Sequence, residues 1–333
     1  MIGKEEICFN CFILVCLFFV VPMRYNDPKR IEVHGAFKNG SMLFLRPEVD
    51  SAYKIATERI SKLQESNGAS YGMTKFSLMP QDEFKNKYLR FRMSDFEGSQ
   101  ALVRQRREAH SFNVSGVPIK FDWREKGLVT SVKTQFQCGA CWAFSTVGVL
   151  ETMYAKKTGK LVDLSSQQVL DCAVGNFGCF GGDTCSALAW MSSNTTRIVP
   201  EEEYPLTFKM QRCKAHTKSD INIRVAKNFT CSNFVGSEEE IIKGVATHGP
   251  LAVAVDGLSW QDYLGGIIRY NCESHLNHAA EIVGYDLSGP IPYYIVKNSW
   301  GADFGIEGYL HIEIGKNLCG LAMRVSALDV LIL

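Results

Sequence analysis

The placement of its twelve cysteines is the feature that most limits how this 333-residue chain folds. Three of them, Cys8, Cys11 and Cys16, lie in an apolar N-terminal run, none lies between residues 17 and 137, and the other nine follow. Twelve are too few for a small scaffold held together by disulfides and more than a cytosolic enzyme usually carries. We therefore expect a cysteine-free N-terminal segment followed by a main body in an oxidising compartment.

The apolar run extends from Ile7 to Pro22. It is shorter than the ~20 residues that a membrane-spanning helix needs, and its length is typical of the hydrophobic region of a secretory signal peptide. The flanks fit less well, because Glu5 and Glu6 follow Lys4 and no Ala-x-Ala pattern comes after the run. We interpret residues 1–23 as a signal peptide, with a short membrane-anchoring or buried helix as the alternative.

Four Asn-x-Ser/Thr sequons occur in the chain, at Asn39, Asn113, Asn194 and Asn228. Behind a signal peptide such sequons become candidate glycosylation sites of a secretory-pathway protein. The nine remaining cysteines are then expected first of all to form disulfides.

Residues 24–116 are polar and cysteine-free, and patterns in them predict helices near Pro47–Glu65 and Gln81–Arg92. Beyond this segment a helical stretch over Cys141–Lys157 comes first, and short β-branched or aromatic strands such as Tyr293–Lys297 come later. Helices first and strands later predict an α+β main body with two lobes. The net charge of +1 gives no general reason to expect nucleic acid or a membrane surface as partner.

The sharpest motif runs from Gln135 to Phe144 and contains Cys138-Gly-Ala-Cys141-Trp142. Cys141 opens the predicted helix, where backbone N–H groups and the helix dipole stabilise a thiolate, the attacking form of cysteine. The side-chain amide of Gln135, together with the Cys141 backbone N–H, can donate hydrogen bonds to the oxyanion of a tetrahedral intermediate. The alternative is a purely structural role for Cys141, as a buried thiol or as half of a disulfide.

A thiolate nucleophile needs a base, and His278 lies 137 residues downstream at the start of an apolar strand. His275, in a polar loop, is its main competitor. Asn298, in Lys-Asn-Ser-Trp-Gly, supplies an oxygen that can accept from one imidazole N–H and fix the ring, and Trp300 would shield that bond from water.

The combined motifs resemble the papain family of cysteine proteases over most of the chain. Further resemblance lies in Phe121-Asp-Trp-Arg124, in Leu164–Cys172 and in Gly178–Gly182. Tyr71–Ser77 resembles the family's propeptide element Gly-x-Asn-x-Phe-x-Asp, with Thr74 and Ser77 in place of its Asn and Asp. The departures are Phe136, where many relatives have Gly, and Phe304 in place of a second Trp.

This resemblance implies a papain-like α+β fold, with a helical left lobe and a β-barrel-like right lobe, preceded by a helical propeptide. It implies an inhibitory propeptide over residues 24–116 and a peptidase domain over 117–333. The implied protein is a lysosomal or secreted zymogen, monomeric and without metal or other cofactor. It would cleave proteins or peptides through a Cys141 thioester, be inhibited by its own propeptide and by cystatin-type proteins, and bind no nucleic acid.

The resemblance also implies the disulfides Cys138–Cys179, Cys172–Cys213 and Cys272–Cys319, and it leaves Cys185 and Cys231 open, as a fourth bridge or as two thiols. It assigns substrate binding to Gly181, Gly182, Asp183, Thr184, Ala254, Ala279, Trp300 and Arg324. Arg324 would lie at the base of the S2 pocket, where it admits an acidic or polar P2 residue, pairs with Asp183 or extends its charged end to solvent.

Two other classes of function remain open from the residues. A non-catalytic papain-fold binding protein usually lacks the nucleophile or the base, and here Cys141, His278, Asn298 and Gln135 are all present. A thiol-disulfide oxidoreductase using Cys138 and Cys141 would leave the other three without a role. A zinc site would need a second ligand pair at a similar spacing, and Cys172 and Cys179 are seven apart.

Overall fold

The computed structural model describes residues 47–332 apart from 66–67, 95–113, 194–195 and 215–222, and these described residues belong to one unit, Arg46–Leu333. The expected signal peptide and the sequons Asn39, Asn113 and Asn194 lie outside them. No helix among the described residues combines the length and the apolar character needed to cross a bilayer.

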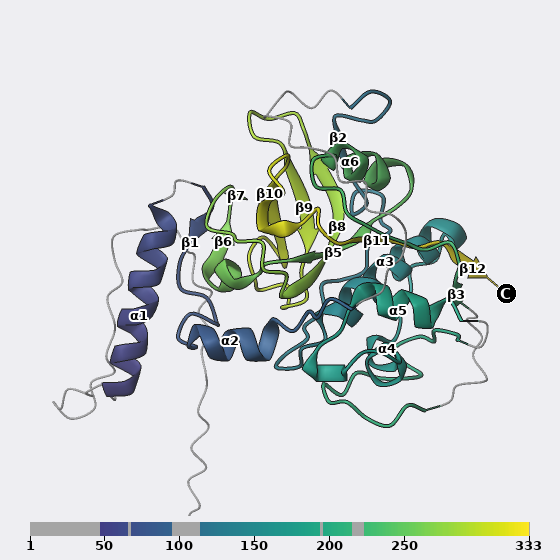
Figure 1. The fold of residues 1–333 in the computed structure, drawn as a ribbon, viewed down its shortest axis with the longest axis horizontal. Helices are drawn as coiled ribbons and strands as arrows, with labels where there is room; N and C mark the ends of the chain where they lie inside the picture. The colour runs from purple at the N-terminus through teal and green to yellow at the C-terminus, as the bar shows by residue number, and fades with distance from the viewer. Residues whose placement is uncertain (1–46, 66–67, 95–113, 194–195, 215–222, 333) are drawn as a thin grey trace, which may run out of the picture. The chain divides into compact units, whose positions relative to one another are not determined.

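Six α-helices occur in the described residues, and several begin or end where the sequence indicates (Figure 1). Ser165 caps the N-terminus of α4 by accepting from the Gln168 N–H, and Gly159 ends α3 in the left-handed conformation. One helix is shorter than predicted: the segment Gln81–Arg92 is helical only as far as Tyr88, and the chain beyond it is extended. The helices are α1 (Pro47–Gln64), α2 (Gln81–Tyr88), α3 (Cys141–Thr158), α4 (Ser166–Cys172), α5 (Thr184–Met191) and α6 (Glu238–Thr247).

One eight-stranded sheet forms most of the second lobe, in the order β4-β11-β5-β8-β9-β10-β7, with β2 paired to β8. All its pairs are antiparallel except β10 with β7. Its members are β2 (Lys120–Asp122), β4 (Thr230–Ser232), β5 (Leu251–Val255), β7 (Ile267–Ile268), β8 (His278–Asp286), β9 (Tyr293–Lys297), β10 (Tyr309–Glu313) and β11 (Val325–Ala327). Smaller sheets pair β1 (Ser70–Tyr71) with β6 (Tyr263–Gly265) and β3 (Ile223–Val225) with β12 (Val330–Ile332). Three short 3₁₀ helices are η1 (Gly178–Phe180), η2 (Leu258–Asp262) and η3 (Leu318–Gly320).

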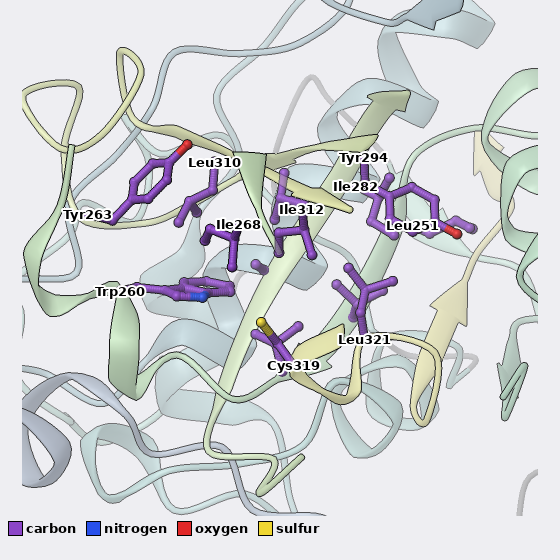
Figure 2. Packing of buried hydrophobic residues seen from close by; sticks show 14 of the residues in the cluster. Leu251, Trp260, Tyr263, Ile268, Ile282, Tyr294, Leu310, Ile312, Cys319 and Leu321 are labelled. Atoms are coloured by element: carbon purple, nitrogen blue, oxygen red, sulfur yellow. The ribbon is translucent and has the colours of Figure 1, made fainter. Parts of the chain in front are cut away.

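Two large hydrophobic cores give the chain its two lobes. One core gathers around α3, α4 and α5, and the other lies against the sheet. Figure 2 shows the second core, in which the labelled side chains come from strands, from η2 and from the segment around η3: Leu251, Trp260, Tyr263, Ile268, Ile282, Tyr294, Leu310, Ile312, Cys319 and Leu321. The lobes meet where α3 packs against β8 and β5. Because α3 is buried on almost every side, it carries apolar residues all round instead of a single stripe. The predicted α+β class with two lobes and preceding helices is confirmed.

The segment that precedes the main body docks on the sheet lobe. Its short strand β1 pairs with β6, and its Phe76 and Phe84 belong to the core of that lobe. Arg59 of α1 donates through Nε (2.5 Å) and a terminal nitrogen (2.9 Å) to the buried Asp262 carboxylate of η2, to which the Ser77 hydroxyl also donates (2.6 Å). This segment is therefore held by apolar burial, by strand pairing and by a buried ion pair.

Four disulfides are present among the described residues. Three are the bonds that the resemblance implies, Cys138–Cys179, Cys172–Cys213 and Cys272–Cys319. The fourth joins Cys185 to Cys231, the pair that the sequence left open. It connects α5 of the helical lobe to β4 of the sheet, so the two lobes are covalently linked.

Candidate active site

Cys141 is the first residue of α3 and the one free cysteine among the described residues. No side chain caps this helix and no acidic residue lies in its first turn, so its free N–H groups and positive dipole end surround the sulfur. In this structure the thiol is fully buried, and burial raises its pKa to about 11, partly offset by the backbone N–H groups of Ala279 and Arg90. The helix end favours a thiolate, while burial keeps the group a thiol.

His278 begins β8 and Asn298 follows the last residue of β9, its antiparallel neighbour. This pairing brings together two residues that are 20 apart in sequence, and His278 Nε2 lies 2.8 Å from Asn298 Oδ1. The amide oxygen is an acceptor, so the ring nitrogen facing it carries the proton. Burial lowers the pKa of His278 to about 4, so the ring is neutral here. The competitor His275 is exposed and faces Glu273.

Aromatic side chains enclose the His278–Asn298 bond. The Trp300 ring lies 4.9 Å from the His278 ring between centroids, and Trp260 meets the same ring edge-on at 5.7 Å. Phe304 packs edge-on against Trp300 at 4.8 Å, which shows that the phenylalanine at this departure from the family pattern still fills the space beside Trp300. Water is thereby kept from the imidazole–amide bond, which strengthens it.

Gln135 lies buried at the junction of the two lobes. Its side-chain oxygen accepts from the Ser299 hydroxyl at 2.7 Å, which fixes the direction of the amide nitrogen. That nitrogen donates to the backbone carbonyls of Cys138 and Tyr88, each at 3.0 Å. Tyr88 belongs to the N-terminal segment, so its carbonyl occupies the donor that the sequence assigns to a reaction oxyanion.

The extended residues after α2 run through the cleft between the lobes. The Phe91 N–H donates to the Asn277 carbonyl (2.8 Å), and Gly182 exchanges two backbone hydrogen bonds with the strand, donating to Arg90 and accepting from Arg92. Gly181, at φ 113°, makes neither bond, but it faces the Arg90 carbonyl so closely that a β-carbon there would collide with it. That residues 89–94 fill the cleft was not predicted, because a helix was expected as far as Arg92.

Phe91 contacts the side chains that the resemblance assigns to the S2 pocket. It clusters with Ala254, Ala279, Leu276 and Cys141. At the edge of this cluster Arg324 donates to Asp183 at 2.8 Å, and the Ser94 N–H and hydroxyl donate to the same carboxylate oxygen at 2.7 and 2.8 Å. Of the alternatives for Arg324, the structure shows the pairing with Asp183.

Thr184, also assigned to this pocket, contacts the hydroxyl of Ser326 on β11 at 2.8 Å. The assigned binding residues Gly182, Asp183, Thr184, Ala254, Ala279 and Arg324 are thus brought together, while Trp300 lies beside His278. Sequence reasoning missed Ser299, which orients Gln135, and Leu276, which closes the apolar cluster; neither carries a motif signal of its own.

A buried charged network lies behind the site, where the lobes meet. The Lys297 ammonium lies 3.8 Å from a Glu281 carboxylate oxygen and donates to the Thr130 hydroxyl, which in turn donates to Glu151 of α3. A small cavity of about 20 Å³ adjoins these groups. Burial raises the pKa of Glu281 to about 7, with Lys297 opposing the shift.

Comparisons with known proteins agree with this geometry. The family model described as papain family cysteine protease matches residues 117–328. The chain is similar to cathepsin O of Homo sapiens, with 44% identity over 80% of this chain and 81% of the relative, and to cathepsin O of Mus musculus, with 41% identity over 80% and 84%. The segment Ser259–Ile268 and the short proregion also resemble those of cathepsin O.

Solved structures of zymogens are similar as well. The proform of Amb a 11, a cysteine protease from ragweed pollen, superposes with a TM-score of 0.71 at 33% identity, covering 86% of this chain and 88% of that one. Procathepsin L2 from Tenebrio molitor larvae gives a TM-score of 0.72 at 28% identity, covering 86% and 95%. Sequence, fold and site geometry lead to the same conclusion: the chain belongs to the papain family of cysteine proteases and is a cysteine peptidase made as a zymogen.

Proposed function

We propose that Cys141 is the nucleophile and His278 the acid and base of an endopeptidase that acts in protein turnover. One observation carries the assignment: the free thiol at the uncapped N-terminus of α3 packs against Ala279, the residue after a histidine whose Nε2 is fixed by Asn298. The Cys138–Cys179 bond speaks against a dithiol oxidoreductase, because Cys138 is not available to pair with Cys141.

The reaction follows from these groups. Cys141 Sγ, as a thiolate, attacks the peptide carbonyl carbon, and Gln135 Nε2 and the Cys141 N–H stabilise the oxyanion. As the C–N bond breaks, the His278 imidazolium gives its proton to the leaving amine, and a thioester remains on Cys141. His278 then takes a proton from water, whose oxygen attacks the thioester, so that the carboxylic acid leaves and the thiolate–imidazolium pair returns.

The segment before the enzyme acts as its inhibitor. Residues 89–94 lie on Cys141 and Gly182, and the Tyr88 carbonyl takes the Gln135 donor, so no substrate has access. We propose boundaries at 1–23 for a signal peptide, 24–116 for the propeptide and 117–333 for the peptidase. Removal of the propeptide would return Cys141 and His278 to water and bring their pKa values back toward the range in which an ion pair forms.

The pocket occupied by Phe91 supports an apolar or aromatic P2 residue. Alanines at positions 254 and 279 leave room for a large side chain, and Arg324 is neutralised by Asp183. An acidic P2 residue would have to compete with Asp183 for Arg324, so we propose that acidic P2 residues are poor substrates.

We further propose a monomer of the lysosome or the secretory pathway, which cystatin-type proteins inhibit through the same cleft. The cathepsin O relatives and the four disulfides support this location. Asn228 is exposed at the turn before β4 and is accessible to glycosylation.

The test is to activate the full chain at pH 4–6 with mild reductant and to treat it with an epoxide that alkylates catalytic thiols. Labelling of Cys141 with parallel loss of peptidase activity supports the proposal. Gln135→Ala should lower kcat by ~10²- to 10³-fold through loss of one oxyanion donor. A folded, processed protein that cleaves no peptide would refute the proposed peptidase function.

A further inference from the structure

Five large apolar side chains lie together on the helical lobe around η1: Phe136, Phe177, Phe180, Phe208 and Met210, here called the aromatic rim. Phe136 is 52%, Phe177 55%, Phe180 67% and Met210 52% exposed, although residues 89–94 occupy the neighbouring cleft. Single exposed apolar residues are ordinary, but a contiguous set of this size marks an interaction surface.

Contacts join Phe136 to Phe208 and place Met210 on the turn that carries Phe177 and Phe180. The Phe136 and Phe208 rings meet edge to face at 4.5 Å, and the Phe208 carbonyl faces the sulfur of Cys179 in η1. Met210 packs over Gly178, the first residue of η1, where a β-carbon would lie 2.6 Å from its sulfur. The turn through η1 then presents Phe177 and Phe180 at its two ends.

Two members of the rim are held in an unfavourable backbone conformation. Phe136 has φ 46° and Phe208 has φ 58°, in the left-handed region that bulky side chains avoid and glycine adopts freely. Strained residues of this kind persist mainly where function uses their side chains. The strained, half-exposed Phe136–Phe208 pair adds nothing to either of the two large cores.

The rim continues directly from the substrate cleft. Phe136 follows Gln135, the proposed oxyanion donor, and Phe177 lies under the Arg92 guanidinium, 5.4 Å from ring centroid to carbon. Arg92 belongs to the strand that bonds Gly182 in the cleft. A polypeptide in the cleft that is longer than this strand therefore reaches the rim as it leaves.

We propose that the aromatic rim is an exosite that binds apolar side chains of unfolded polypeptide substrates outside the cleft. Its aromatic rings and flexible methionine suit side chains of varied shape, and the site therefore selects for exposed hydrophobic chain instead of a fixed sequence. This inference rests on the proposed peptidase function.

The test compares two substrates of the activated full chain. The first is an N-blocked dipeptidyl aminomethylcoumarin, which occupies the cleft alone, and the second is reduced, carboxymethylated lactalbumin, an unfolded protein. Phe136→Gly and Phe208→Gly should each lower kcat/KM for the protein by about 10-fold, as loss of an aromatic anchor does, and leave the dipeptide within about twofold. Leu161→Ala, which removes a side chain 47% exposed elsewhere on the helical lobe, is the matched control and should change neither value.

Glycine suits a positive φ, so both variants should keep or raise the melting temperature, which separates the effect from misfolding. Equal losses on both substrates, or none on the protein, would overturn the inference. So would self-association that the variants abolish while protein turnover is unchanged, because the rim would then bind a second copy of the chain.

A binding measurement tests the exosite apart from the proposed chemistry. With Cys141 alkylated, carboxymethylated lactalbumin should bind about 10-fold more weakly to Phe136→Gly than to the parent protein. If neither substrate is turned over, the peptidase proposal fails, and the binding measurement alone tests the exosite. Equal binding of lactalbumin to the parent protein and to Phe136→Gly would overturn the exosite.

Discussion

Substitution of Asp262 by asparagine should loosen the propeptide without harming the enzyme. Asp262 lies fully buried in η2, accepts two hydrogen bonds from Arg59 and one from Ser77, and belongs to the enzyme side of the contact. The substitution removes the charge but keeps the shape, and it leaves the Arg59 guanidinium, 13% exposed, without its counter-ion.

The size of the effect follows from burial. Breaking one side of a buried ion pair costs about 3–5 kcal/mol, and the partial exposure of Arg59 places this pair near the lower value. A loss of ~3 kcal/mol corresponds to a roughly 150-fold larger population of open zymogen. Lys75–Asp303 crosses the same interface but is 39% and 68% exposed, so Asp303→Asn should change that population by less than about fivefold.

The assay is the rate at which an epoxide inhibitor labels Cys141 in the intact zymogen at neutral pH, because only the open form reacts. Asp262→Asn should be labelled about 150-fold faster than the parent chain, and Asp303→Asn at nearly the parent rate. After processing, all three proteins should cleave a dipeptidyl amide equally well. The reasoning fails if the two variants speed labelling equally, or if Asp262→Asn leaves the rate unchanged.

Three further outcomes are expected. Burial lowers the pKa of His278 to about 4 in the closed form. In a Cys141→Ser chain, which forms no thiolate to share a proton with the imidazole, opening is therefore accompanied by the uptake of one proton as pH falls from 6.5 to 4. The population of the open form, measured by hydrogen exchange in residues 89–94, should grow up to ~10-fold for each unit by which the pH falls in this range. His278→Gln should lower the slope of log population against pH by one, and an unchanged slope would contradict this. Glu281 has its pKa raised to about 7, so its contribution to stability is present in acid and is lost between pH 4.5 and 7, by up to about 3 kcal/mol. Glu281→Gln should therefore shrink the fall in melting temperature between pH 5 and 7.5, and an equal fall in both proteins would refute the assignment. The double substitution Cys185→Ala/Cys231→Ala opens a loop of sequence separation 46 and should cost up to ~4 kcal/mol in denaturant unfolding, whereas a loss below ~1 kcal/mol would show that the bond constrains little.

Much of the site was predictable because it depends on local chemistry. A thiol at a helix start, a histidine at a strand start and an asparagine after the next strand are each visible as short patterns. Once the strands pair as neighbours, the His278–Asn298 bond follows from their register. The catalytic roles themselves stay predictions until activity is measured.

The rest depended on tertiary contacts that no local pattern encodes. The helix predicted over Gln81–Arg92 ends at Tyr88 because the extended chain beyond it places Phe91 in an apolar pocket and forms strand-like backbone hydrogen bonds. Phe91 bonds to Asn277, and Arg90 and Arg92 bond to Gly182. Helix propensity is a weak preference, and such contacts override it. α6, whose core-facing residues include Ile241 and Ile242, was not predicted at all.

Partners that lie far apart in the sequence could not be predicted either. Ser77 stands where the propeptide element has an acid, and the structure supplies the carboxylate from Asp262, 185 residues away. Pairing of Cys185 with Cys231 likewise needed the distance between α5 and β4, which spacing in the sequence does not contain.

The bond between Cys185 and Cys231 also has a mechanical consequence. The adjacent Thr184–Ser326 contact places this disulfide near the Asp183–Arg324 end of the cleft. The two walls of the cleft are therefore covalently joined at one edge. Walls joined in this way cannot separate at that edge, so opening of the cleft would be a hinge motion about the bond. The tether also couples the two cores, so that heating should melt both lobes in a single cooperative transition and not one after the other.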